Sequence, residues 1–137
     1  MANWCSVGFA LTFDSPEGAD AYMKTLESRG CSERGCSTPI DIGGGRPLFE
    51  SYVRRDSYDD CRVLVSGEVK WALEHEDFVG IVKLAMKHLT KAVCNYYEET
   101  EHIMGVYTWT KDSPDSIADK CIADEDWPEF EGDIETD

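Results

Sequence analysis

Apolar residues near the N-terminus recur at every second position, and this alternation constrains the fold more than any other feature of the chain. The alternating residues are Val7, Phe9, Leu11 and Phe13. A period of two predicts a β-strand with one face in the core. Ser15, Pro16 and Glu17 follow, supplying a capping hydroxyl, a proline suited to the first helical turn and a carboxylate at the positive end of the helix dipole. The chain therefore starts with a strand and continues into a helix near residues 16–29.

A second helix and further strands are predicted along the rest of the chain. After the acidic start Glu76-Asp77, an apolar stripe predicts a helix near residues 76–91; the stripe consists of Phe78, Ile81, Val82, Ala85, Met86 and Leu89. Gly67 interrupts one apolar run, which indicates a bulge or a close backbone approach. Strands are expected at Leu48–Arg55, Asp60–Trp71, Val93–Glu99, Ile103–Thr110 and Ile117–Ala123.

Helices alternating with groups of strands predict an α+β fold in a single domain. Two helices can cover one face of a largely antiparallel sheet, and a ferredoxin-like split βαβ sandwich with extra C-terminal strands fits this order best. We expect the domain to span residues 1–123 and an acidic segment to occupy residues 124–137. The predicted core contains Val7, Phe9, Leu11, Val63, Val65, Ile81, Val82 and Leu89.

Residues 30–47 are predicted to form a loop that binds neither phosphate nor metal. The triplet Gly43-Gly44-Gly45 is not part of a GxxxxGK(S/T) motif and no helix pattern opens after it, so a flexible turn is expected. Cys31 and Cys36 are spaced like half of a zinc site, but the other cysteines and histidines contain no second close pair. We therefore expect no metal and no cofactor.

The N-terminus and the lack of long apolar runs predict a cytoplasmic protein. The N-terminal stretch has no basic n-region and alternates like a strand, unlike a signal peptide. No run of about 18 apolar residues occurs, so no membrane span is expected. In a reducing compartment all six cysteines should be free thiols; they are Cys5, Cys31, Cys36, Cys61, Cys94 and Cys121.

The N-terminal motif resembles that of a known family. Met1-Ala2-Asn3-Trp4-Cys5-Ser6, leading into an alternating strand, resembles the start of small phage and plasmid proteins with a YubB-like ferredoxin fold. Val7 stands where that family has Asn. The resemblance covers about residues 1–110 and includes Lys70-Trp71 and the pair of segments Tyr96-Tyr97-Glu98-Glu99 and Gly105-Val106-Tyr107-Thr108-Trp109. It implies a ferredoxin-like fold and a mobile-element origin, and it brings no catalytic residues.

Acidic residues are concentrated at the C-terminal end. The formal net charge is −15, and residues 111–137 contribute −9 of it, with eleven acids against Lys111 and Lys120. Such a surface repels nucleic acid and attracts basic partners, so direct nucleic-acid binding is not expected. The acids are Asp112, Asp115, Asp119, Asp124, Glu125, Asp126, Glu129, Glu131, Asp133, Glu135 and Asp137.

The spacing of the last acids indicates how they could bind. From Glu129 to Asp137 an acid occupies every second position, and alternate side chains of an extended segment share a face about 6.6 Å apart. Successive phosphates along a nucleic-acid strand have a comparable separation. A solubilising tail is the alternative, but the aromatic residues favour docking, on a partner or on the chain's own domain. The predicted partner-binding residues are Asp119, Asp124, Glu125, Asp126, Trp127, Glu129, Phe130, Glu131 and Asp133.

No strong catalytic constellation accompanies these features. His75 with Glu74 or Asp77 could act as a base with an orienting acid, and His102 lies among glutamates that could hold a metal, but neither belongs to a catalytic motif. We expect a non-enzymatic inhibitor from a phage or mobile element that occludes the basic nucleic-acid groove of a host protein, such as a CRISPR effector complex. The alternatives are an adaptor domain that binds another basic protein and a metal-dependent enzyme using His102.

Overall fold

Antiparallel strands form one sheet in the part of the chain that the structure describes. The computed structural model describes residues 4–29, 40–41, 47–70, 73–98 and 103–121. Within these ranges seven strands lie in the order β2-β3-β4-β1-β5-β6-β7, and each is antiparallel to its neighbours. Their bounds are β1 Trp4–Phe13, β2 Ile40–Asp41, β3 Pro47–Asp56, β4 Asp59–Lys70, β5 Leu89–Glu98, β6 Ile103–Thr110 and β7 Ile117–Cys121.

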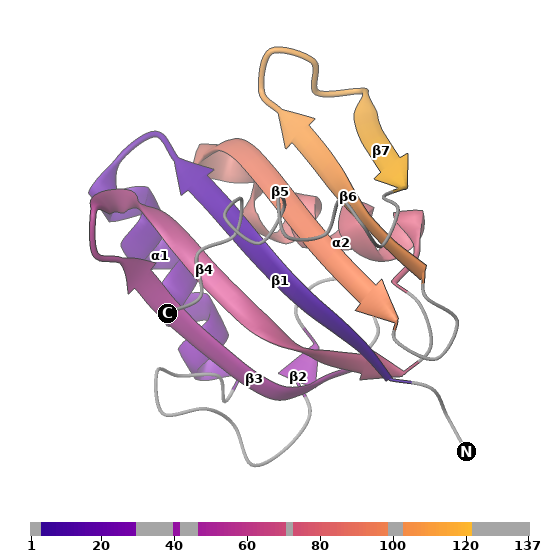
Figure 1. Ribbon diagram of the computed structural model, residues 1–137. Helices are drawn as coiled ribbons and strands as arrows, with labels where there is room; N and C mark the ends of the chain where they lie inside the picture. Colours follow the sequence, from indigo (N-terminus) through magenta and orange to yellow (C-terminus); the bar gives the residue numbers. More distant parts are fainter. Residues whose placement is uncertain (1–3, 30–39, 42–46, 71–72, 99–102, 122–137) are drawn as a thin grey trace.

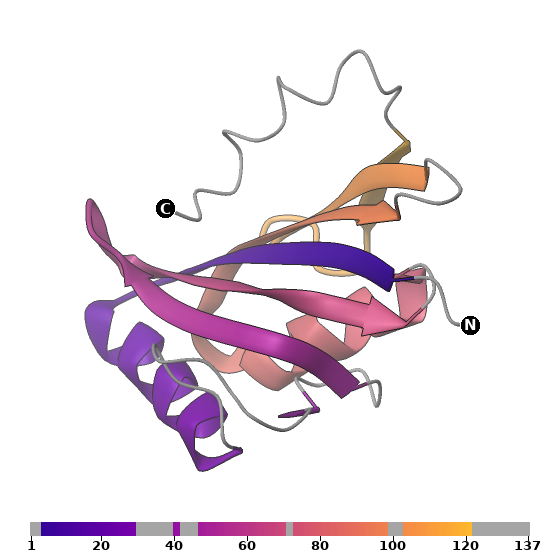
Figure 2. The same cartoon turned by 60° about the horizontal axis from the view of Figure 1, so that its bottom comes forward.

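Two helices cover the same face of this sheet. α1 spans Pro16–Ser28 and α2 spans His75–Ala85, followed by the short 3-10 helix η1 at Met86–His88. Figure 1 shows α1 and α2 behind the sheet, and the turned view in Figure 2 places both beneath it. No helix covers the other face among the described residues, and we call it the open face. The expected α+β class, with a largely antiparallel sheet and two helices, is confirmed.

Each helix connects two strands that have a third strand between them. α1, followed by the short β2, leads from β1 to β3, and β4 lies between β1 and β3 in the sheet. α2 and η1 join β4 to β5, and β1 lies between them. The intervening strand is antiparallel to both of its neighbours, so the connected strands run parallel to each other. β1 is therefore the central strand, paired on both edges.

The core lies between the helices and the sheet face that they cover. All eight residues predicted as core are buried, with exposed fractions of at most 5%. Phe78 of α2 stacks on Tyr107, and Tyr107 stacks on Tyr96, with ring centroids 5.5 and 5.1 Å apart. Burial of each large apolar side chain stabilises the fold by roughly 1.5–3 kcal/mol. On β1 the residues that face the helices include the predicted set Val7, Phe9, Leu11 and Phe13.

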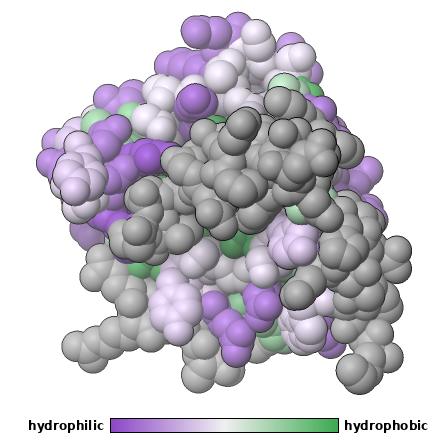
Figure 3. Space-filling model, viewed as in Figure 1, coloured by the Kyte–Doolittle hydropathy of each residue, from purple (hydrophilic) through white to green (hydrophobic). Residues whose placement is uncertain are grey.

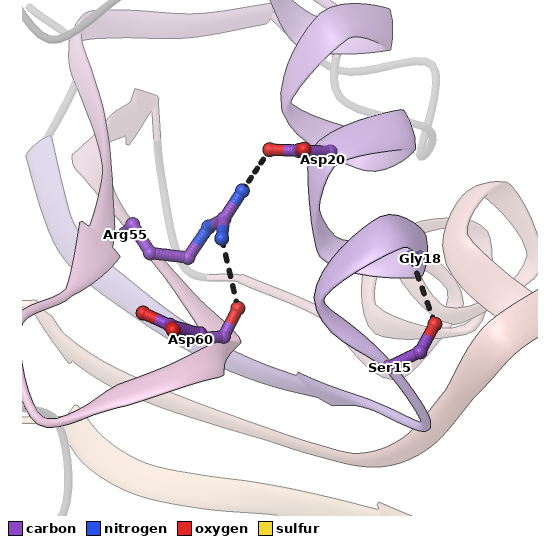
Figure 4. A network of polar contacts seen from close by, with 5 residues as sticks. All are labelled: Ser15, Gly18, Asp20, Arg55 and Asp60. Atoms are coloured by element: carbon purple, nitrogen blue, oxygen red, sulfur yellow. Dashed lines mark hydrogen bonds and ion pairs between the residues drawn. The ribbon is translucent and has the colours of Figure 1, made fainter.

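Side-chain hydrogen bonds mark where both helices begin. The Ser15 hydroxyl accepts a hydrogen bond from the Gly18 amide at 3.1 Å, and Pro16 opens α1, as the sequence predicts (Figure 4). At the start of α2, the Asp77 carboxylate accepts a hydrogen bond from the Glu74 amide at 2.9 Å. Such bonds satisfy amide groups that have no partner within the helix itself.

The second helix is shorter than the prediction of residues 76–91. α2 and η1 end at His88, and Leu89 begins β5. The chain changes direction there because the His88 carbonyl accepts a hydrogen bond from the Asp14 amide at 2.8 Å, and Leu89 then pairs with Phe13 in the sheet. Leu89 is buried as predicted, but it reaches the core from a strand and not from a helix.

The predicted strands are all present, with differences at their ends. β5 starts at Leu89 and not at Val93, because it follows η1 directly. The two-residue strand β2 lies inside the predicted loop 30–47, where it pairs with the first residues of β3. Such a short strand carries no alternation of its own, so its pairing with β3 decides its structure.

Gly67 lets a core side chain lie directly against the backbone of β4. A Cβ atom at Gly67 would lie 2.7 Å from Cγ of Leu48, whose side chain is fully buried. The register between β1 and β4 continues through Gly67, whereas β3 shifts between Phe49 and Tyr52 on the opposite edge. Glu50, at this shift, has a φ of 50°. Gly67 therefore marks a close approach, and the bulge lies in the neighbouring strand.

We predict that Gly67→Ala destabilises the protein by roughly 1–3 kcal/mol, because the added methyl group overlaps the Leu48 side chain in a packed core. Leu48→Ala alone should cost about 2–5 kcal/mol through the cavity that it leaves. In the double variant the new methyl group fills part of that cavity, so the combined cost should be less than the sum. Chemical denaturation of the four proteins measures this coupling, and additive costs would show that the two side chains do not compete for one space.

Candidate functional site

Three carboxylates of the acidic end lie on or beside the edge strand β7. Asp112 and Asp115 are exposed in the turn between β6 and β7, and Asp119 is exposed on β7 itself. The Tyr96 hydroxyl donates a hydrogen bond to the Asp119 carboxylate at 3.5 Å. Among the described strands β7 is the last in the order, so it forms one margin of the sheet. These three carboxylates therefore line this margin of the sheet.

Most residues of the predicted site lie outside the described residues. Of the predicted partner-binding set, the structure places Asp119 alone; the others are Asp124, Glu125, Asp126, Trp127, Glu129, Phe130, Glu131 and Asp133. His102 and the pair Cys31 and Cys36 also lie outside the described ranges. Their proposed roles stay predictions.

Among the side chains that the structure describes, the open face carries four bases that sequence analysis does not bring together. Arg62 of β4 and Lys91 of β5 both lie opposite Thr12 of the central strand. By the same register, Arg54 of β3 and Lys70 of β4 occupy positions on this face. Residues paired across strands point to the same face, so bases from three strands share one surface. Each base alternates with core residues of its strand, but only the strand order shows that the strands are neighbours.

A hollow of about 510 Å³ lies on the open face, and charged and apolar side chains both line it. Arg62 and Lys91 supply positive charge, and Asp59 supplies one carboxylate. Ala10 and Val106 are among its apolar side chains. Figure 3 views this face and shows hydrophilic surface gathered over the β3–β4 hairpin. Such a lining suits a ligand that combines carboxylates with apolar groups.

An ion pair holds Arg62 beside the hollow. Its Nη1 atom lies 3.1 Å from Oδ2 of Asp56, and the Tyr58 amide donates to Oδ1 of Asp56 at 2.9 Å. The Tyr58 hydrogen bond is the main reason that the pKa of Asp56 is lowered; burial opposes it, and the Arg62 guanidinium adds to it. Asp56 is therefore charged at neutral pH, and it anchors both Arg62 and the β3–β4 turn.

Aromatic side chains gather at the other end of the open face. The rings of Trp4 and Phe49 meet edge to face with centroids 5.1 Å apart, and Lys70 Nζ lies 5.6 Å from the Phe49 centroid. Trp4 is 43% exposed and Tyr52 is 54% exposed. Contacts of these kinds stabilise by roughly 0.5–1.5 kcal/mol each and leave much of the rings accessible to a partner.

Two carboxyl groups meet between β3 and β4. Glu68 is hydrogen-bonded to Glu50, and the pKa of Glu68 is raised above its ordinary value, first by desolvation and then by this neighbouring carboxyl group. Two carboxylates in contact repel each other, so the pair is most stable when one of them holds a proton. Glu68 thus weakens the positive potential of the open face most at high pH.

Arg55 connects α1 to β4 on the helix-covered side of the sheet. Its Nη1 atom donates to the Asp60 carbonyl at 2.9 Å, and its Nη2 atom pairs with the Asp20 carboxylate of α1 (Figure 4). Nearby, the pKa of the Cys61 thiol is raised by desolvation and by the carboxylates of Asp59 and Asp60. A raised pKa makes a thiol a poor nucleophile at neutral pH. The neighbouring carboxylates therefore disfavour the thiolate form of Cys61.

The described histidines are surface groups near helix ends. His75 is exposed at the start of α2 and lines a groove of about 290 Å³ beside the β6–β7 hairpin. His88 Nδ1 lies 3.4 Å from the Asp14 carboxylate. Among the described residues, no group of three or more His, Cys, Asp or Glu side chains is arranged to hold a metal ion. No helix in the described ranges is long and apolar enough to cross a bilayer.

Comparison with protein-family models, with curated proteins and with solved structures found no match for this chain. The functional assignment therefore rests on the sequence and on the two charged surfaces of the described fold: the acidic margin at β7 and the basic open face.

We predict that alkylation of the native protein separates the cysteines by burial. Cys5, Cys61 and Cys94 are free thiols, and burial raises the pKa of Cys94 well above its ordinary value. Cys61 should react slowly with a maleimide, whereas Cys5 and Cys94 should react only after unfolding. Intact-mass measurement in denaturant without reductant should show all six thiols labelled. Three protected pairs would instead indicate disulfides and overturn the expected compartment.

We predict that Glu68→Gln stabilises the protein near pH 7. The raised pKa of Glu68 means that its contribution to stability is fully present below its unfolded value of 4.5 and is lost as the pH rises through the folded value. Glutamine stays neutral, so the variant should gain only a few tenths of a kcal/mol, because the site is partly exposed and solvent screens its charge. The gain should vanish below about pH 4. Urea denaturation from pH 4 to pH 8 tests this, with exposed Glu27→Gln as the control; a gain that grows as the pH falls would contradict it.

Proposed function

We propose that this protein is a non-enzymatic inhibitor, carried by a phage or another mobile element, that blocks a basic nucleic-acid-binding groove on a host protein. The leading target class is a CRISPR effector complex. The carboxylates of residues 111–137 would take the places that phosphates occupy in the groove. A net charge of −15 favours a basic protein partner over nucleic acid itself.

The observation that carries the proposal is the exposed acidic margin at β7. Asp112, Asp115 and Asp119 are held on a paired hairpin, and the chain continues from there into residues 124–137. Carboxylates on a folded hairpin lose less conformational entropy on binding than carboxylates on a free chain. Their charge would speed association with a basic groove, and a buried aromatic side chain such as Trp127 would slow dissociation.

We further propose that the fold is ferredoxin-like, with the split βαβ arrangement. The strand order β3-β4-β1-β5 and the position of both helices on one face support this assignment. Together with the Asn3-Trp4-Cys5-Ser6 motif, it supports a relation to the YubB-like family and hence a mobile-element origin. β6 and β7 would then be an extension that carries the acidic end to the margin of the sheet.

We predict that the protein competes with DNA or RNA for its target. The protein should inhibit the binding of DNA or RNA to a purified CRISPR effector complex. This inhibition should weaken steeply as the salt concentration rises, because exposed charges are screened over about 8–10 Å near physiological ionic strength. Reversing the charge of Asp124, Asp126, Glu129 and Glu131 to lysine should slow association and abolish inhibition. Trp127→Ala should instead speed dissociation. Biolayer interferometry separates the two rates.

Matched variants show whether the position of the charge matters. Glu27→Lys with Glu76→Lys changes the net charge as much as Asp124→Lys with Asp126→Lys does, but on exposed helical positions. The helix pair should leave inhibition nearly unchanged, while the C-terminal pair should weaken it. A protein that lacks residues 124–137, folds normally and inhibits at full strength would exclude the acidic segment as the inhibitor. Specific capture of a basic protein without nucleic-acid function would favour the adaptor alternative.

A further inference from the structure

We propose that the C-terminal segment, residues 122–137, docks on the open face of its own sheet when the protein is free. The occupant of the open face is thus part of the same chain. This proposal concerns the free protein and does not rest on the proposed inhibitory function. It assigns a partner to a surface on which four bases, a hollow and buried apolar side chains occur together.

Charge complementarity favours this segment. Residues 122–137 contain eight acids and no base. The open face presents Arg54, Arg62, Lys70 and Lys91 from three strands. The central strand β1 lies between β4 and β5, so Arg62 and Lys91 flank it at Thr12. An acidic segment that crosses these strands meets a positive surface, whereas the β7 margin offers further carboxylates.

Apolar complementarity favours the same surface. Ala10 and Leu64 form one small buried cluster on the open face, and Met104 and Val106 form a second, against which Tyr97 and Val93 pack. By register these residues point away from the two helices. The segment supplies the apolar side chains Ile122, Trp127, Phe130 and Ile134. Burial of these side chains against the open face would add the hydrophobic free energy that exposed ion pairs lack.

The length of the segment and the place where it starts are sufficient for this contact. β7 ends at Cys121 on the margin of the sheet, and sixteen residues follow. An extended chain of that length spans about 50 Å. From β7 to β4 there are four strand spacings, about 19 Å. The segment can therefore cross the open face even if part of it is not extended.

The groove on the helix-covered side is a weaker candidate. It is lined by His75, Lys83 and Asp115 together with apolar residues such as Met86. It has one permanent positive charge, Lys83, against one carboxylate, whereas the hollow on the open face has Arg62 and Lys91 against the single carboxylate of Asp59. The open face offers more positive charge and a larger hollow of about 510 Å³.

Docking of this kind would make the acidic segment less available to a partner. A partner that binds the segment must first displace it from the open face, so its apparent affinity falls in proportion to the fraction of free segment. Weakening the open face should then strengthen binding to a basic partner. The protein would thereby discriminate against weakly basic surfaces, which compete poorly with its own bases.

Limited proteolysis of the full-length protein tests the docking directly. Endoproteinase Glu-C cleaves after glutamate, and the segment contains Glu125, Glu129, Glu131 and Glu135. A synthetic peptide of residues 122–137, added to the same tube, serves as the unprotected standard. At about 20 mM salt the segment in the protein should be cleaved roughly threefold or more slowly than in the peptide, and at about 0.5 M salt the two rates should converge, since screening weakens exposed charge pairs.

A matched pair of variants locates the docking surface. Arg54→Gln with Lys91→Gln removes two charges from the open face without adding a cleavage site, and Lys83→Gln with Lys87→Gln removes two from exposed positions on α2 and η1. The open-face variant should lose most of the protection at low salt, and the helical control should keep it. Thermal unfolding confirms that both variants fold; should the open-face variant fail to fold, the wild-type comparison with the peptide still decides whether the segment is protected.

Three outcomes would overturn the proposal. Equal cleavage of protein and peptide at low salt would mean that the segment does not dock. Protection that rises with protein concentration, together with a dimer in light scattering, would assign the open face to a second copy. Binding of a fluorescent single-stranded oligonucleotide by the wild-type protein, lost in the open-face variant, would show an accessible nucleic-acid surface and not a covered one.

Discussion

The pairing of β1 on both of its edges is the constraint on which the rest of the structure depends. β1 is bonded along its length to β4 on one side and to β5 on the other. Because successive side chains point to opposite faces, a single register decides which residues enter the core and which line the open face. A slip of one residue would expose Phe9 and Leu11 and bury Thr12. Core packing therefore fixes the positions of Arg62 and Lys91 as well, since both lie opposite Thr12.

The same constraint divides the charge of the molecule between two surfaces. A chain with a net charge of −15 still gathers four bases on one sheet face, while three acids line the margin at β7, counted over the described side chains. The β6–β7 hairpin links these surfaces, because it extends the sheet beyond β5 and carries the acidic end at its margin. The two proposals give the acidic segment that starts there two basic surfaces, one in the same molecule and one on the proposed partner. The balance between them would set how tightly a partner is bound.

Local patterns predict those elements whose own side chains decide their structure. The structure contains the strand predicted from the alternation that ends at Phe13 and the helix predicted from the apolar stripe that starts at Phe78, and each buries one face. It also contains the predicted helix cap at Ser15. The end of the second helix could not be read in this way, because Leu89 continues the apolar stripe of α2 equally well. A hydrogen bond between His88 and Asp14, residues far apart in the chain, ends the helical segment.

The sequence by itself determined the α+β class, the core residues and the concentration of acid at the C-terminal end, because periodicity and composition are local properties of a chain. Tertiary structure decided where the bases lie. Arg54, Arg62, Lys70 and Lys91 belong to three strands, and nothing in the spacing of these strands along the chain shows that β1 and β4 are neighbours. Long-range pairing alone brings these side chains to one face, since side chains from different strands meet only when hydrogen bonds set the strand order and the register.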